Sequence, residues 1–170
     1  MVQIRPATAS DAEDIAIAHA ASIAGLCKKH YSAPDIEKWK AVLVPEIYSS
    51  AIEEKITLVG EDNGRILVLG ILDPETAEIS AIYVHPAAAH KGAGTRMLAA
   101  LEDAARAAGI ERISLCATLN AAGFYHHHGY TGEESAFHCL SNGTRLECIK
   151  MQKRMSLSVR RTFRRESDDR

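Results

Sequence analysis

The sequence lacks the features that mark membrane, secreted and nucleic-acid-binding proteins. No stretch approaches the roughly 20 consecutive apolar residues of a membrane span, and Met1 to Pro6 lack the basic and then apolar run of a signal peptide. The 4 cysteines show no Cys-x-x-Cys spacing, so neither a zinc knuckle nor a disulfide framework is indicated. A formal net charge of -2 gives no electrostatic footprint for nucleic acid or an anionic membrane. We therefore expect a cytoplasmic protein with reduced thiols, no nucleic-acid partner and no membrane partner.

The composition fits one domain followed by a charged end. A chain of 170 residues with 46% hydrophobic content can build a core without disulfides or metal. Residues 156–170, in contrast, are charge-rich and hold only Leu157, Val159 and Phe163 as apolar residues. Such a segment cannot bury enough surface to order itself. We expect a folded domain over 1–155 and a flexible tail over 156–170, with contacts to acidic partners as the alternative role of the tail.

The hydrophobic periodicity alternates between that of helices and that of strands. Asn63-Gly64 is a strong hairpin turn between two of the strands, and Ser10 and Ser32 are candidate N-caps for the first two helices. The order strand, helices, three strands, helix, strand, helix, two strands predicts a mixed α+β fold. Helices are expected over 10–26, 32–43, 45–54, 92–108 and 121–128, and strands over 2–5, 56–59, 65–72, 77–84, 112–117, 135–140 and 145–150.

The most informative segment runs from His85 to Thr95, where the chain leaves a strand and begins a helix. The free N–H groups of a helix N-terminus, aided by the helix dipole, form a ready site for a pyrophosphate. Gly92 and Gly94 leave the backbone accessible, while Lys91 and Thr95 add a charge and a hydroxyl. Glycines at helix starts also occur for packing, so this pattern alone leaves both readings open.

The same segment resembles the coenzyme A loop of the GCN5-related N-acetyltransferase (GNAT) superfamily, whose motif is Arg/Gln-x-x-Gly-x-Gly/Ala. The matching positions here hold Ala89-His90-Lys91-Gly92-Ala93-Gly94. Ala89 departs from the motif, so one side-chain contribution to the pyrophosphate is missing while the backbone donors remain. A second match lies downstream, where Asn120 to Tyr125 and then Gly129-Tyr130 resemble the family's Asn…Phe-Tyr-x-x-x-Gly-Phe/Tyr element.

The resemblance covers the chain from Val2 to about Met155 and carries expectations about fold and reaction. It implies an α+β fold with a mixed, mostly antiparallel central sheet flanked by helices and splayed between the fourth and fifth strands. It implies an acyltransferase that moves an acetyl group from acetyl-coenzyme A to a primary amine of a small molecule or peptide, by direct attack in a ternary complex and without a metal. Homodimers are common in the family. The coenzyme A site implied by the match consists of Ile82, Tyr83, Val84, Ala89, His90, Lys91, Gly92, Ala93, Gly94, Thr95, Asn120 and Tyr125.

Two side chains are candidates for proton transfer. An alkyl amine is protonated at neutral pH, so a carboxylate that accepts its proton is useful. Glu78 interrupts an otherwise apolar strand, and its spacing to Gly92 is similar to that of the general base in histone acetyltransferases of the superfamily; the alternative is an outward-facing glutamate. The resemblance implies that Tyr125 protonates the coenzyme A sulfur, with a core tyrosine as the alternative. Asn120 either contacts coenzyme A or caps the helix that follows.

The acceptor is expected to bind against the segment 26–48, where the family is most variable. Tyr31, Trp39 and Tyr48 are candidates for an aromatic wall there, although Trp39 lies on the apolar face of its own helix and core packing is favoured for it. The sequence does not identify the amine.

Competing interpretations rest on histidines, cysteines and Ala89. His126-His127-His128 cannot converge on one metal ion from consecutive helical positions, so a solvent-facing cluster is favoured. Three cysteines, Cys116, Cys139 and Cys148, fall in expected strands and are interpreted as core residues, not nucleophiles. The functional alternative is a non-catalytic sensor or regulatory module that binds acyl-coenzyme A without turnover, and Ala89 is the feature that keeps it open.

Overall fold

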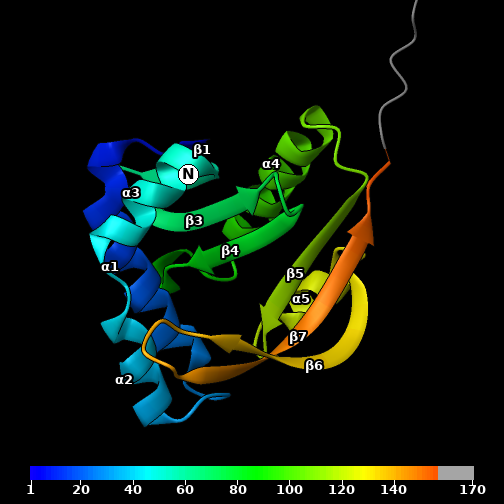
Figure 1. The fold of residues 1–170 in the computed structure, drawn as a ribbon. Coiled ribbons are helices and arrows are strands. Elements are labelled where there is room, and N and C mark those ends of the chain that lie inside the picture. The colour runs from blue at the N-terminus through cyan, green and yellow to red at the C-terminus, as the bar shows by residue number, and fades with distance from the viewer. Residues whose placement is uncertain (157–170) are drawn as a thin grey trace, which may run out of the picture.

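The computed structural model describes residues 1–156, so the expected tail lies outside the described residues except for Ser156. Seven strands and five α-helices follow one another in nearly the predicted order (Figure 1). The strands are β1 Gln3–Pro6, β2 Ile56–Asp62, β3 Arg65–Asp73, β4 Glu78–Val84, β5 Arg112–Thr118, β6 Thr131–Cys139 and β7 Arg145–Arg154. The α-helices are α1 Ala12–Ser22, α2 Ala33–Ala41, α3 Pro45–Glu54, α4 Ala93–Ala107 and α5 Ala122–His127, with shorter helical turns at Ala9–Asp11, Ile23–Cys27 and Pro86–Ala88.

The strands form a single sheet in the order β1-β2-β3-β4-β5-β7-β6. Every neighbouring pair is antiparallel except β4 and β5, which are parallel. These two strands pair only at Glu78↔Ser114 and Ile79↔Leu115 and then diverge, which opens a V in the sheet (Figure 1). The expected mixed, mostly antiparallel sheet, splayed between its fourth and fifth strands, is confirmed.

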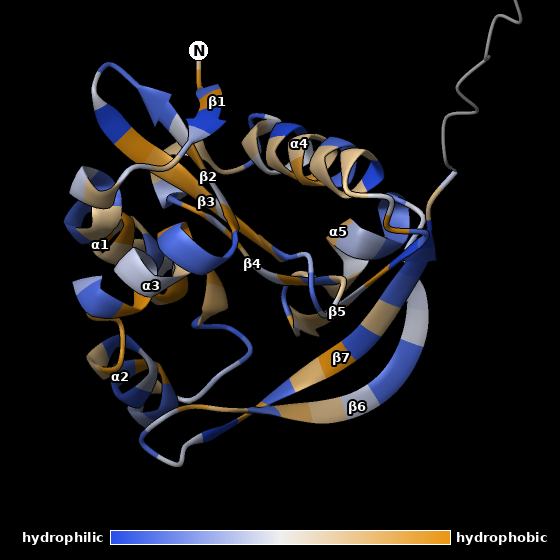
Figure 2. Cartoon of the chain, turned by 45° about the horizontal axis from the view of Figure 1, so that its top comes forward, coloured by the Kyte–Doolittle hydropathy of each residue, from blue (hydrophilic) through white to orange (hydrophobic). Residues whose placement is uncertain are grey.

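The helices cover the two faces of the sheet. On one face α1 packs against β3 and β4 and α3 packs against α1 and β2, and on the other α4 crosses β2, β3 and β4. One face of α4, the helix expected over 92–108, is apolar and buried, with Met97, Leu98, Leu101 and Ala105 in the main core. Figure 2 shows the hydrophobic residues of β2 and β3 concentrated between these two helix layers. This packing fixes the end of β4 against the start of α4.

The Asn63-Gly64 turn forms as predicted. Asn63 has φ 52° and Gly64 φ 74°, and both values lie in the left-handed region that suits a tight hairpin. The expected final hairpin also forms, because β6 and β7 pair antiparallel. Local turn chemistry was therefore sufficient to find both hairpins.

Several predicted boundaries were wrong. Pro6 belongs to β1, which is possible because β1 is an edge strand. The first helix does not run unbroken over 10–26: α1 ends at Ser22 and a π-helical turn, Ile23–Cys27, follows. Strands β6 and β7 extend well beyond the predicted 135–140 and 145–150, because pairing with a neighbour continues into polar residues.

The cysteine prediction was correct for Cys148, which is buried, and wrong for Cys116 and Cys139, which are exposed. In β5, Cys116 lies between the core residues Leu115 and Ala117. Its side chain therefore points to the opposite face of the strand, away from that core. Cys139 lies on β6, which forms the outer edge of the sheet and is exposed along most of its length. Within residues 1–156, no helix is long and apolar enough to cross a membrane.

Candidate active site

A cavity of about 370 Å³ lies where β4 ends and α4 begins. It is built by the last residues of β4, the loop before α4, the start of α5 and the π-helical turn after α1. Residues expected at the coenzyme A site that line it are Ile82, Tyr83, Val84, Ala89, His90, Gly92, Ala93, Gly94, Thr95, Asn120 and Tyr125. Lining residues outside the expected coenzyme A set are Ser22, Leu26, Cys27, Ala88, Thr118, Ala121 and Phe124. Leu26 and Cys27 belong to the segment 26–48 where the acceptor was expected, and the structure places them in a π-helical turn, a feature frequent at functional sites.

The loop from His85 to Gly92 aims the start of α4 at this cavity. His85 Nδ1 accepts a hydrogen bond from the Ala87 amide at 3.1 Å, which fixes the turn after β4. Gly92 precedes the helix with φ 77°, a conformation that a glycine adopts without strain. The first bond of the helix runs from the Arg96 amide to the Gly92 carbonyl at 3.1 Å. The amides of residues 92–95 therefore precede the hydrogen-bonded ladder and are available at the cavity.

The space beside Gly94 fits a phosphate group. A Cβ at position 94 would lie 3.5 Å from Cγ2 of Val84 and 3.6 Å from the Phe124 ring, so a larger side chain would fill the gap between β4 and α5. Because glycine has no side chain, the amides at the start of α4 remain open to the cavity. The residues present therefore fit a diphosphate bound by main-chain donors.

Of the two charged groups near this loop, Lys91 differs from expectation and Arg96 was not predicted. Lys91 does not line the cavity, because its Nζ donates to the Ala87 carbonyl at 2.8 Å. The guanidinium of Arg96 instead approaches Gly92, 3.9 Å from where a Cβ would stand. Arg96 lies one helical turn after Gly92, a spacing that could have been noticed in the sequence.

Tyr125 projects from α5 into the cavity and is only 6% exposed. Its ring packs edge-on against Phe124 and Tyr130. Its hydroxyl forms no hydrogen bond within residues 1–156, in contrast to the hydroxyls of Tyr31, Tyr48 and Tyr130. Burial raises the pKa of the Tyr125 phenol above its usual value, so the group keeps its proton at neutral pH. An unpaired, protonated hydroxyl at a cavity wall can donate a proton to a bound molecule.

Asn120 lines the cavity and does not cap α5. Its Oδ1 accepts from the Cys27 thiol at 3.5 Å, and the N-cap of α5 is Ala121. Burial raises the pKa of Cys27 to about 11, so this thiol stays protonated and is a poor nucleophile. The Asn120 side chain therefore does not take the alternative role of a helix cap.

Glu78 lies outside this cavity, at the start of β4, where β4 still pairs with β5. It lines a slot of about 70 Å³ on the other side of the V, together with Tyr31, Trp39, Tyr83 and His138. A smaller space of about 20 Å³, lined by Tyr83, Thr118 and Tyr125 among others, shares residues with both the cavity and the slot. The cavity and the slot therefore adjoin at Tyr83 and Thr118, with Tyr125 lining the cavity and Glu78 lining the slot.

An aromatic row forms one wall of the slot. Tyr31 and Trp39 pack edge-on with ring centroids 5.5 Å apart, and Trp39 lies 6.1 Å from Tyr83. Trp39 is 3% exposed and also belongs to a core cluster, so it both packs and lines the slot. Tyr48 lines neither the cavity nor the slot, because it lies behind the wall, where its hydroxyl bonds His19 Nδ1 at 2.8 Å.

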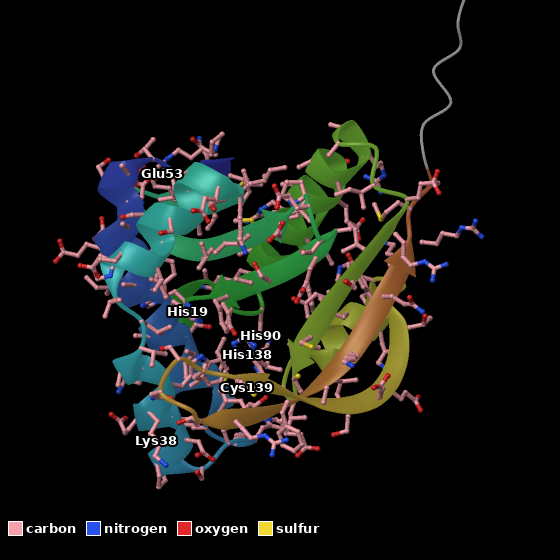
Figure 3. The ribbon with its side chains drawn as sticks, in the orientation of Figure 1. His19, Lys38, Glu53, His90, His138 and Cys139 are labelled. Atoms are coloured by element: carbon pink, nitrogen blue, oxygen red, sulfur yellow. The ribbon has the colours of Figure 1, made fainter. Side chains whose placement is uncertain are left out.

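His19 is a buried histidine behind the row, stacked on Tyr83 with ring centroids 3.7 Å apart. Its Nε2 has no hydrogen-bond partner within residues 1–156. Figure 3 marks His19, His90 and His138 around the opening of the sheet. Burial, and to a lesser degree His138, lowers the pKa of His19 from 6.5 to about 3, so the ring is neutral in the folded protein.

Stability should therefore fall as the pH drops from 6.5 toward 3. In this window the unfolded chain takes up a proton on His19 and the folded chain does not. Between pH 7 and pH 5 we expect the unfolding free energy to drop by about 2 kcal/mol more in the wild type than in His19→Phe. Urea denaturation at both pH values measures the difference, with the exposed His126→Gln as control. An equal drop in wild type and His19→Phe would contradict a neutral His19.

The histidine run at the end of α5 does not form a ligand set. His126 and His127 are exposed, and His128 Nδ1 bonds the Phe124 carbonyl at 2.8 Å. Within the described part of the chain, no three His, Cys, Asp or Glu side chains are grouped so that they could hold a metal ion.

Comparisons with known proteins agree with this arrangement. The family model described as Acetyltransferase (GNAT) family matches residues 27–130. A GCN5-related N-acetyltransferase structure from Rhodopseudomonas palustris superposes with a TM-score of 0.83 at 28% identity, covering 91% of this chain and 96% of that one. The PaiA N-acetyltransferase of Thermoplasma acidophilum, solved with coenzyme A, gives a TM-score of 0.76 at 20% identity, covering 91% and 99%. The ribosomal-protein-S18-alanine N-acetyltransferase of Escherichia coli gives a TM-score of 0.68 at 16% identity, covering 96% of this chain and 99% of that one.

No curated protein sequence matches significantly. Since the family model spans more than half of the chain and the motif residues line one cavity, the protein belongs to the GNAT family of acetyltransferases.

Proposed function

We infer that this chain transfers an acetyl group from acetyl-coenzyme A to a primary amine by direct attack in a ternary complex. The observation that carries the proposal is that the cavity and the slot adjoin at shared wall residues beside the V of the sheet. One chamber has the free amides of a helix N-terminus and the other has a carboxylate. Two family structures with coenzyme A or acetyl-coenzyme A bound, from Thermoplasma acidophilum and Salmonella typhimurium, support the choice of donor.

The donor would be held mainly by the main chain. The amides of residues 92–95 suit its diphosphate, and the edge of β4 over Ile82–Val84, left unpaired where β5 diverges, suits the amide groups of its pantetheine arm. Asn120 and Thr95 add polar side chains at the wall. Acetyl-coenzyme A supplies a thioester, whose carbonyl carbon is open to an amine. Main-chain donors could compensate for the absence of Arg or Gln at position 89, because they do not depend on that side chain.

The chain's own residues would manage two protons. Glu78 accepts one from the ammonium form of the acceptor, directly or through water, so that the nitrogen has a free electron pair. The new C–N bond forms as the C–S bond breaks, and Tyr125 donates its hydroxyl proton to the departing sulfur. The second proton released from nitrogen replaces the one lost by Tyr125, and Glu78 releases the first to solvent, which leaves an acetamide, a free thiol, one proton in solution and an unchanged protein. The protonated thiol of Cys27 argues against a cysteine-bound acetyl group.

Release of free thiol from acetyl-coenzyme A in the presence of an amine panel tests the proposal. Thiol should appear in step with acetylated amine, and isothermal calorimetry should show coenzyme A binding. Binding without thiol release from any amine would favour the alternative, an acyl-coenzyme A sensor. Absence of both would reject the cavity as a coenzyme A site.

Replacing Glu78 with glutamine should make the reaction depend on spontaneous loss of the amine proton. We expect kcat/KM to fall about 100-fold at pH 7 and the deficit to shrink toward pH 10, where an alkyl amine is largely unprotonated. The measurement is the pH profile of kcat/KM for wild type and variant. Glu75→Gln, on the exposed turn before β4, is the matched control. A profile of unchanged shape in Glu78→Gln would remove Glu78 from the base role.

A further inference from the structure

The place where the cavity and the slot adjoin offers no lysine or arginine. Among residues 1–156, neither residue type lines the cavity, the slot or the small space of about 20 Å³ that shares residues with both. Attack of an amine on a thioester moves negative charge onto the carbonyl oxygen. In a shielded site that charge is stabilised by hydrogen-bond donors that already point at it. The donors available here are therefore neutral groups, which are main-chain amides and side-chain hydroxyls.

Two hydroxyl side chains, those of Tyr83 and Thr118, come from residues at this junction. Both residues line the cavity, the slot and the small space, and no other described residue lines all three. The bond between a donor in the cavity and an acceptor in the slot would form where these spaces adjoin. A hydroxyl at this position is therefore near the reacting carbonyl.

The Tyr83 hydroxyl is free to bind a ligand. Of the five tyrosines, three bond other residues through their hydroxyls, whereas Tyr83 and Tyr125 form no such bond within residues 1–156. In the same part of the chain, Nε2 of His19 is the one buried side-chain nitrogen or oxygen without a partner. The Tyr83 oxygen also lacks a partner, so it is not sealed in the core and is open to the space beside it.

The Tyr83 ring is held by two neighbouring rings, which gives its hydroxyl a fixed position. The His19 ring of α1 stacks on it with centroids 3.7 Å apart, and Trp39 of α2 packs edge-on with centroids 6.1 Å apart. Tyr83 also packs against the core clusters beneath α1 and α2, on the same side of the sheet as the aromatic wall of the slot. A donor that is already oriented needs no reorganisation when charge develops in front of it.

Burial keeps the Tyr83 hydroxyl in the form of a hydrogen-bond donor. It raises the pKa of the phenol well above its usual value, because the charged phenolate is disfavoured away from water. The group therefore stays protonated at neutral and mildly alkaline pH. A phenol is also a stronger donor than the alkyl hydroxyl of Thr118, because it is the more acidic of the two. Tyr83 is thus the better suited of the two hydroxyls to face a developing negative charge.

We propose that Tyr83 is a further catalytic residue, whose hydroxyl donates a hydrogen bond to the thioester carbonyl oxygen while the amine attacks. Electron density moves onto that oxygen as the C–N bond forms and returns when the C–S bond breaks, and Tyr83 keeps its proton throughout. This role rests on the proposed acetyltransferase function and adds a residue to its chemistry.

Tyr83→Phe tests this role, because it keeps the ring and its packing and removes only the hydroxyl. With acetyl-coenzyme A and the best amine of the panel, we expect kcat from thiol release to fall about 100-fold, the cost of one such donor. The dissociation constant of coenzyme A, which has no thioester, should change by less than about 3-fold. The pH profile should keep its wild-type shape, because Tyr83 transfers no proton. Tyr48→Phe, behind the aromatic wall, is the control and should keep the wild-type kcat.

The carbonyl stretch of bound acetyl-coenzyme A, isotope-labelled at the acetyl carbonyl, gives a second readout that needs no acceptor. A hydrogen bond polarises the C=O bond and lowers its stretching frequency. Infrared difference spectra should therefore show a higher frequency with Tyr83→Phe than with the wild type, and the wild-type frequency with Tyr48→Phe. If no amine is turned over, this frequency alone decides, and an unchanged value rejects the role of Tyr83.

Three results would overturn the role of Tyr83 and leave the acetyltransferase function standing, since the wild type would still release thiol. The first is a wild-type kcat in Tyr83→Phe. The second is a loss of kcat in Thr118→Val that Tyr83→Phe does not show, which would make Thr118 the donor. The third is a pH profile of changed shape in Tyr83→Phe, which would assign a proton transfer to this residue instead of a hydrogen bond.

Discussion

Tyr125→Phe should lower kcat by about 100- to 1000-fold, the range expected for loss of a general acid. The variant removes one hydroxyl from a cavity wall and keeps the ring. Because this hydroxyl has no partner within residues 1–156, its loss breaks no hydrogen bond in the fold. The raised pKa of Tyr125 keeps the phenol protonated at neutral pH, which is the form a proton donor needs. The dissociation constant of coenzyme A should change by less than about 3-fold, which is under 1 kcal/mol.

Tyr48→Phe is the matched control for this prediction. Tyr48 is equally buried, but its hydroxyl bonds His19 and lines neither chamber. We expect this variant to lose about 1 kcal/mol of stability and to keep its kcat. Stopped-flow or steady-state thiol release gives kcat, and thermal unfolding gives stability. Full activity in Tyr125→Phe would assign protonation of the sulfur to water or to another group.

Gly94→Glu should abolish coenzyme A binding in practical terms, with a dissociation constant raised at least about 100-fold. The new side chain would start between Val84 and the Phe124 ring and extend into the cavity. A carboxylate near a diphosphate in a partly shielded site costs a few kcal/mol, and each 1.4 kcal/mol is about tenfold in affinity. Gly94→Ala should give a smaller loss, about 3- to 10-fold, because its Cβ meets neighbours only at ordinary contact distance.

Ala99→Glu tests whether added charge on the helix is enough to weaken binding. Ala99 is exposed on α4, away from the cavity lining. Calorimetry should show affinity near the wild-type value for this variant, and circular dichroism should show all three variants folded. Tight coenzyme A binding by Gly94→Glu would mean that the diphosphate binds somewhere other than the start of α4.

The parts of the fold that sequence reasoning found best are those set by neighbours along the chain. The hairpin at Asn63-Gly64 and the stripe of α4 were correct because turn geometry and helical periodicity are local. The exposure of Cys116 was missed because strand alternation gives two faces without saying which one is covered. The split of the first helix was also missed, since an alanine-rich run gives no signal for a π-helical turn. The flexibility of the tail stays a prediction, because residues 157–170 lie outside the described structure.

The candidate site also has one part that the sequence located and one part that it did not. The loop from His85 to Thr95 was located in the sequence because adjacent residues make it: a strand end, two glycines and a helix start. The slot could not be located in the sequence, because residues far apart in the chain line it, from α2, β4, β5, β6 and β7. Tyr83 was expected only at the donor, yet it borders both chambers, and His138 and Glu147 carried no motif.

By itself the sequence determined that a helix N-terminus with free amides follows a buried strand, because glycine positions and periodicity act over a few residues. Only the tertiary structure decided where β4 and β5 separate, since that depends on contacts between elements that are far apart in the sequence. That separation begins just after the pair Glu78↔Ser114, beside the slot that Glu78 and the aromatic wall line, and Tyr125 lines the adjoining cavity.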